Sequence, residues 1–159
     1  TLLAIMQAAK KADDSLLRDY AETTVAVADI KIAVRSMKTG KNKDFMKRAM
    51  AECNTLDIDR LATAAVAGME EIERYLADTA YAGGAEALSK SASAFERWCD
   101  NRIIETIKPQ KYNPFTVGPI VAYILARLNE IKTVRIILTC KLNQLPEEAI
   151  RERVREMYV

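Results

Sequence analysis

The sequence contains no histidine, the side chain that enzymes most often use to transfer protons near neutral pH. General acid or base catalysis would therefore need a glutamate, lysine or cysteine with a shifted pKa. The acidic pair Glu70 and Glu71 lies in a helix-favouring stretch and is typical of a solvated helix face. The sequence also lacks a glycine-rich phosphate loop and a serine or cysteine in a nucleophile elbow. These observations predict no catalytic residue and no enzyme.

The three cysteines, Cys53, Cys99 and Cys140, are odd in number and lie far apart in the sequence. They show no Cys-x-x-Cys spacing, and without histidine the usual mixed zinc site cannot form. A Glu-x-x-His pair, which would indicate a di-metal bundle, is also missing. We therefore expect reduced thiols in a cytosolic compartment, and neither a metal site nor another cofactor.

The net charge of +2 is too small to indicate a nucleic acid as the partner. Its distribution is uneven, because residues 101–159 hold ten basic and six acidic side chains, whereas the first hundred hold fourteen and sixteen. The C-terminal part is therefore the better place for an acidic partner to bind. The longest apolar run, VGPIVAYILA, ends after ten residues at Arg127, whereas a membrane-spanning helix needs about twenty residues.

Half of the 159 residues are hydrophobic and only nine are glycine or proline, which predicts an all-α protein with a packed core. The spacing of apolar residues predicts where the helices lie. Side chains that can cap a helix N-terminus mark two of the helix starts: Asp13, Asp14 and Ser15 for one, and Asp57 for the other. We expect breaks at Gly40 and at Gly83 and Gly84. The predicted helices cover about residues 1–12, 16–39, 42–52, 57–76, 88–103, 118–143, opened by Gly118 and Pro119, and 145–158.

The proline-rich stretch KPQKYNPF, residues 108–115, is the natural boundary between lobes. It separates a helical lobe over residues 1–107 from a C-terminal lobe segment over residues 108–159. In the last helix, Pro146 lies near the first turn, and Glu147 and Arg151 have the spacing of an ion pair.

Two of the predicted helices carry a narrow apolar seam with residues three and four positions apart. The second seam contains an arginine, Arg135, which must reach the surface or meet an acid, because breaking a buried pair costs about 3–5 kcal/mol. Glu130 on the same helix is out of phase, so the acid must come from elsewhere. Two interpretations stay open: Arg135 extends to solvent or pairs inside its own domain, or its seam meets another chain. The first seam is Leu16, Tyr20, Thr23, Val27, Ile30, Val34 and Met37; the second is Ile124, Leu128, Ile131, Arg135, Leu138 and Leu142.

The two seam helices are similar in sequence. DIKIAVRSMKTGKN at 29–42 can be compared with EIKTVRIILTCKLN at 130–143. Arg, Thr and Lys recur after 100 residues, whereas Ile-Lys recurs after 101. One residue turns a helix face by about 100°, so a strict repeat is not established, although a duplicated helical lobe fits the pattern.

Residues 121–159, VAYILARLNEIKTVRIILTCKLNQLPEEAIRERVREMYV, resemble the C-terminal segment of the C subunit of V-type and A-type ATPases or ATP synthases, the counterpart of the eukaryotic V-ATPase d subunit. The family pattern there is an aromatic Tyr, Glu-Ile-Lys-x-x-Arg-Ile-Ile, Lys-x-Asn-x-Leu and a basic, helical ending with Tyr-Val. VADIKIAVRSMKTGK and FERWCDNRIIETIK extend the resemblance upstream, although Ala28 or Asp29 replaces a usual Asn and Cys140 a usual Gly. The matched residues that we take as structural or interface candidates are Tyr123, Glu130, Lys132, Arg135, Lys141, Asn143, Arg151 and Arg153.

The resemblance implies a mechanical role without catalysis. Proteins of this family are funnel-shaped and built of three similar helical lobes, and this chain resembles roughly the C-terminal half. They form a socket on the cytoplasmic face of the proteolipid ring, receive the D and F subunits of the central shaft, and couple ATP turnover to proton or sodium transport. The resemblance thus implies the shaft and the ring as partners and a peripheral membrane location. We expect Arg135 and Glu130 to maintain lobe geometry, and the basic C-terminal lobe as a whole to meet the shaft.

Two other classes of protein compete with this interpretation. A stand-alone helical scaffold or adaptor would have the same seams and charge, and it would not co-purify with shaft and ring subunits. A helical nucleic-acid-binding module would show strongly salt-dependent affinity. That module also needs a basic cluster interleaved with aromatic residues, which the sequence lacks.

Overall fold

The structure is a computed structural model that describes residues 2–12, 14–112 and 115–158. All regular secondary structure in these ranges is helical, which confirms the predicted all-α class. The chain divides into two compact units, unit 1 over Thr1–Ser89 and unit 2 over Lys90–Val159. The predicted lobe boundary at 107/108 falls within unit 2, where residues 108–112 form a short 3-10 helix that packs on the helices before and after it.

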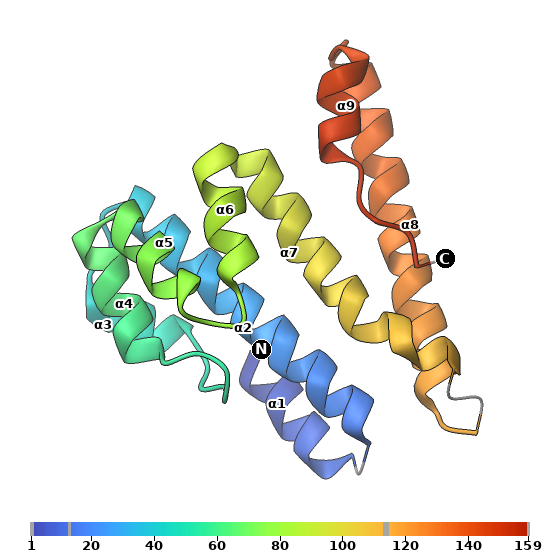
Figure 1. The fold of residues 1–159 in the computed structure, drawn as a ribbon, viewed down its shortest axis with the longest axis horizontal. Coiled ribbons are helices and arrows are strands. Elements are labelled where there is room, and N and C mark those ends of the chain that lie inside the picture. The colour runs from blue at the N-terminus through green and yellow to red at the C-terminus, as the bar shows by residue number, and fades with distance from the viewer. Residues whose placement is uncertain (1, 13, 113–114, 159) are drawn as a thin grey trace. The chain divides into compact units, whose positions relative to one another are not determined.

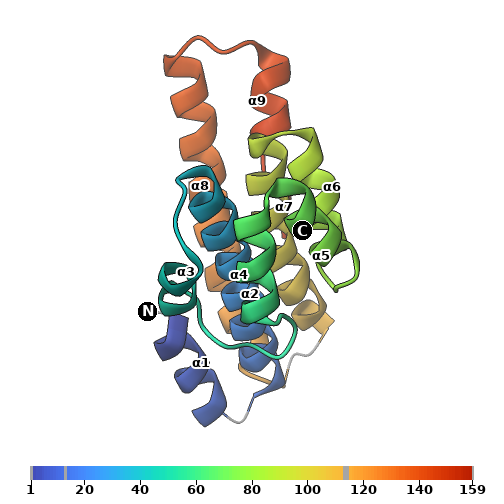
Figure 2. The ribbon, with the colours of Figure 1, turned by 90° about the vertical axis from the view of Figure 1, so that its left-hand side faces the viewer.

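Unit 1 is organised around one long helix, α2, on which α1, α3, α4 and α5 pack (Figures 1 and 2). Its helices are α1 (Leu2–Lys11), α2 (Ser15–Lys38), α3 (Lys43–Ala49), α4 (Ile58–Ala67), α5 (Met69–Ala77) and α6 (Ala82–Lys90).

The sequence signals at both ends of α2 are confirmed. Asp14 caps its start by accepting a hydrogen bond from the Leu17 N–H at 3.1 Å, whereas Asp13 lies outside the described residues. At the other end Gly40 adopts a φ of 65°, which favours glycine and stops the helix. The predicted seam faces the core: Leu16, Thr23, Val27, Ile30 and Val34 are buried, and Tyr20 and Met37 are half-buried.

Two predictions about where helices of unit 1 end are wrong. Residues 57–76 form two helices, because Gly68 adopts a φ of 139° and the chain turns there. Asp57 still caps the first of them by accepting hydrogen bonds from the backbone of Asp59 and Arg60. Gly83 and Gly84 lie inside α6 instead of breaking the chain. The chain turns just before these glycines, at residues 78–81, and again at Ser91, whose side chain accepts a hydrogen bond from the Ala94 N–H at 3.0 Å and caps α7.

Unit 2 consists of α7 (Ala92–Ile107), the short 3-10 helix η1 (Lys108–Tyr112), α8 (Gly118–Leu142) and α9 (Glu147–Arg153). The predicted start of α8 at Gly118 and Pro119 is confirmed. The last helix is shorter than predicted, and residues 154–158 are extended and run back along α8 (Figure 1). The last helical hydrogen bond runs from the Val154 N–H to the Ile150 carbonyl at 3.2 Å, and two residues further on the Glu156 N–H donates to the Asn101 side chain at 2.8 Å. None of the described helices is long and apolar enough to cross a membrane.

Candidate functional site

Helix α8 carries most of its large apolar side chains on the face that is exposed in unit 2. The buried face consists of small or polar side chains, among them Ala122, Ala126, Asn129 and Thr133. The opposite face extends over about 33 Å, as the rise of an α-helix between its first and last members requires. We call this exposed face the α8 stripe; its members are 48% to 84% exposed and are Ile120, Tyr123, Ile124, Leu128, Ile131, Val134, Leu138 and Leu142.

The stripe corrects the prediction for the second seam. The three-and-four spacing did find an apolar face of α8, but this face does not pack within unit 2. The packed face contains small side chains, which permit close contact with neighbouring helices. Five of the six seam residues therefore belong to the stripe, and the sixth is Arg135.

Arg135 is not a member of the stripe but lies on the same face of α8, between Ile131 and Leu138, and is exposed. Among the described residues no carboxylate lies within ion-pair distance of it, so the acid partner predicted from the same lobe is not found. The Arg135 guanidinium stays in contact with water in unit 2. No desolvation cost arises, so the side chain needs no acidic partner there. Glu130 pairs with Arg127 instead, three residues earlier on the same helix.

Four other predicted residues lie near the ends of α8 and α9. Asn143 caps α8 by donating from Nδ2 to the Thr139 carbonyl at 2.8 Å. Arg151 forms the predicted pair with Glu147 at 2.6 Å, which confirms the i,i+4 assignment. Arg153 donates to the Ala149 carbonyl at 2.7 Å, and Lys141 is exposed. These local contacts stabilise helix ends by a few tenths of a kcal/mol each at an exposed surface.

Lys132, the remaining candidate, belongs to a cluster that sequence reasoning missed. Its Nζ lies 2.6 Å from Oδ1 of Asp100 on α7, and Arg155 donates from Nε to the other carboxylate oxygen at 2.6 Å. Asp100 is 9% exposed and Arg155 is 8% exposed, so their pair is shielded from water. One carboxylate therefore joins α7, α8 and the extended C-terminal segment. We call these three residues the Asp100 clamp.

Further polar contacts hold the same C-terminal segment in place. Asn129 donates from Nδ2 to the Glu156 carbonyl at 2.7 Å, and Lys108 pairs with the Glu156 carboxylate at 2.8 Å. Asp100 and Arg155 are 55 residues apart, so no local spacing pointed to their contact. The sequence hint for a buried charge was that Asp100 directly follows Cys99 on the predicted apolar side of its helix.

A buried carboxylate also lies in unit 1. Asp29 on α2 is fully buried, and its Oδ1 accepts a hydrogen bond from the Ala51 N–H at 3.2 Å. Its Oδ2 has no hydrogen-bond partner among the described residues. Burial raises the pKa of Asp29 to about 7, against the opposing effect of the Ala51 N–H. Nearby Cys53 also has a raised pKa, mainly through burial.

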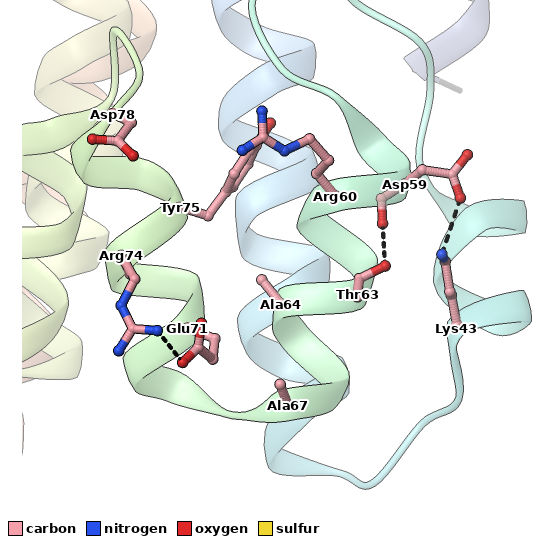
Figure 3. Close-up of a pocket in the computed structure, with 10 residues that line it drawn as sticks. All are labelled: Lys43, Asp59, Arg60, Thr63, Ala64, Ala67, Glu71, Arg74, Tyr75 and Asp78. Atoms are coloured by element: carbon pink, nitrogen blue, oxygen red, sulfur yellow. Dashed lines mark hydrogen bonds and ion pairs between the residues drawn. The ribbon is translucent and has the colours of Figure 1, made fainter.

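Unit 1 has an open hollow of about 430 Å³ whose walls come mainly from α4 and α5 (Figure 3). Four of its charged groups form ion pairs, Lys43 with Asp59 at 3.2 Å and Arg74 with Glu71, and Arg60 lies over the ring of Tyr75. The ammonium groups of Lys47 and Lys43 lower the pKa of Asp59. These pairs neutralise the wall, and the described residues contain no cluster of acidic or cysteine side chains that would hold a metal ion.

The fold and the α8 stripe define a helical protein whose most prominent surface is suited to packing against other helices. The chain belongs to the ATP synthase (C/AC39) subunit family, whose model matches residues 1–153. The C subunit of the A-type ATP synthase of Methanocaldococcus jannaschii is 27% identical to it over 148 residues. This match covers 87% of the chain and 37% of that protein, so the chain spans little more than a third of its relative's length. No solved structure matches the chain. The resemblance found in the sequence motifs is thereby confirmed.

Proposed function

We propose that the chain is part of a non-catalytic central-stalk subunit of a rotary V/A-type ATPase. In this role it couples the central shaft, made of the D and F subunits, to the proteolipid ring during ATP-linked proton or sodium transport. The match of the family model over residues 1–153 carries the proposal. The archaeal relative, the C subunit of an A-type ATP synthase, supports it.

The packing of the two units suits the transmission of force. Their central helices, α2 and α8, have 24 and 25 residues. Close-packed protein interiors have low compressibility and transmit strain. In unit 2 the Asp100 clamp adds ionic contacts among α7, α8 and the C-terminal segment, which restrain these elements from sliding past one another.

The contacts suggest how the candidate residues divide between two roles. Residues that make internal bonds maintain lobe geometry, whereas exposed residues without such bonds are available to partner subunits. This changes the expected role of Arg135 from lobe geometry to an interface. We assign Glu130, Lys132, Asn143, Arg151 and Arg153 to lobe geometry, and Tyr123, Arg135 and Lys141 to the interface.

The proposal is tested with the full subunit, expressed from its complete gene and used to capture the purified D and F subunits of the shaft. We expect stable capture of both shaft proteins, and association with the proteolipid ring in detergent. An unrelated helical protein of similar charge serves as the control for non-specific binding. A subunit that binds neither shaft nor ring would contradict the coupling role and favour a stand-alone scaffold or adaptor.

A further inference from the structure

The two units repeat one succession of elements. In each, a long helix is followed by a residue with positive φ, Gly40 at 65° or Gln144 at 55°, and then by a seven-residue helix, α3 or α9. An extended segment comes next in both units. At an offset of 100 residues the buried faces of the long helices coincide: Ala26, Asp29 and Ala33 are buried on α2, and Ala126, Asn129 and Thr133 on α8.

The long helices differ in how much of their surface is covered. Of the α2 residues equivalent to members of the stripe, Thr23 and Val34 are at most 8% exposed, Lys38 is exposed, and the others are half-buried: Tyr20, Thr24, Ala28 and Lys31. On α8, the equivalent Tyr123 and Val134 are 63% and 54% exposed. In unit 1, α4 and α5 also pack on the long helix, whereas the described elements that pack on α8 are α7, η1 and α9. The stripe thus lies on the helix that lacks a counterpart of the α4–α5 pair.

We propose that the α8 stripe is the docking surface for a pair of amphipathic helices from the part of the same subunit that lies outside this chain. These helices pack on α8 as α4 and α5 pack on α2. The match to the archaeal relative covers only 37% of that protein, so a subunit of similar length has ample residues to supply the pair. An uncovered apolar face of this length is uncommon on a monomer and marks an interaction site.

The charge of the stripe defines the chemistry of the incoming helices. Arg127 is already neutralised by Glu130, whereas Arg135 has no acid within ion-pair distance among the described residues. Covering the stripe removes water from the Arg135 guanidinium, so the incoming apolar face must present a carboxylate opposite it. The inference concerns assembly of the subunit alone and does not depend on the coupling role.

Thiol labelling of the full subunit, purified as a monomer without shaft or ring, tests this docking. Leu138→Cys places a thiol in the stripe, and Glu148→Cys places a matched thiol on the exposed surface of α9. We expect a maleimide to label Leu138→Cys at least tenfold more slowly than Glu148→Cys, with mass spectrometry separating these sites from the three native cysteines. In the isolated 159-residue chain the two rates should be similar. Adding Arg135→Glu to the full subunit should restore fast labelling in the stripe.

Each of the following outcomes would contradict the proposed docking of a helix pair from the same subunit on the α8 stripe. Equal rates in the full monomer would show that the stripe stays open. Protection only after adding the D and F subunits, or only in a dimer, would place the stripe against another chain. Protection in the 159-residue chain alone, or a complete gene that encodes nothing further, would also exclude the proposed occupant. Leu142→Cys, at the most exposed member of the stripe, replaces Leu138→Cys if that variant loses the native fluorescence of Trp98.

Discussion

Replacing Asp100 with alanine should lower the free energy of unfolding of unit 2 by about 3–5 kcal/mol, the usual cost of removing one partner from a buried ion pair. The cost arises because the Arg155 side chain is only 7% exposed and would lose its carboxylate where water cannot replace it. Trp98, the only tryptophan, lies on α7 in unit 2. Its fluorescence during urea denaturation therefore reports on this unit.

Two further variants separate the buried pair from the exposed one. Lys132→Met should cost less than about 1 kcal/mol, because the Lys132 side chain is 49% exposed and its pair with Asp100 is partly screened by water. The double variant Asp100→Ala/Arg155→Met should recover much of the loss, because no unpaired charge stays buried. Equal costs for Asp100→Ala and Lys132→Met would contradict the dominant role of the Arg155 pair.

Replacing Asp29 with asparagine should remove a pH dependence from the stability of unit 1. Burial raises the pKa of Asp29 from 3.8 to about 7, so the folded state holds this proton more tightly than the unfolded state. The stabilising contribution is fully present below pH 3.8 and is lost as pH rises through about 7. Between pH 5 and pH 8, the wild-type unit should lose on the order of 2 kcal/mol, from linkage applied to these two values.

Asparagine keeps the acceptor for the Ala51 N–H and carries no charge at either pH. Asp29→Asn should therefore keep a constant stability between pH 5 and pH 8, so that its advantage over the wild type grows across this range, as measured by far-UV circular dichroism during urea denaturation. Asp19→Asn, on an exposed part of the same helix, should keep the wild-type pH dependence. A wild-type unit 1 that is equally stable at both pH values would show that Asp29 is already ionised in the folded state at pH 5, and would contradict a pKa raised by burial. Trp98 fluorescence follows unit 2 separately.

The positions of the helices could be predicted from the sequence better than the residues against which each helix face packs. Asp14, Asp57 and Gly40 marked helix ends correctly, because capping and positive φ are local properties of the chain. Gly68 separates two helices, whereas Gly83 lies inside one. Whether a glycine breaks a helix depends on the φ that the surrounding packing imposes.

The candidate site shows the same limit. The periodicity identified the apolar face of α8. It does not show which face packs within the unit, because the opposite face consists of small side chains that also pack well. The Asp100–Arg155 pair joins residues 55 positions apart, so only the folded chain brings it together. The family motif includes Lys132 but does not indicate which acid it contacts.

Ion transport by membrane vesicles tests the proposed non-catalytic coupling role most directly. Vesicles that carry the rotary ATPase without this subunit should show no ATP-driven uptake of protons or sodium, although the separated head still hydrolyses ATP. Adding the purified full subunit should restore uptake, while the subunit alone hydrolyses no ATP. Undiminished ATP-driven uptake in vesicles that lack the subunit would contradict the account.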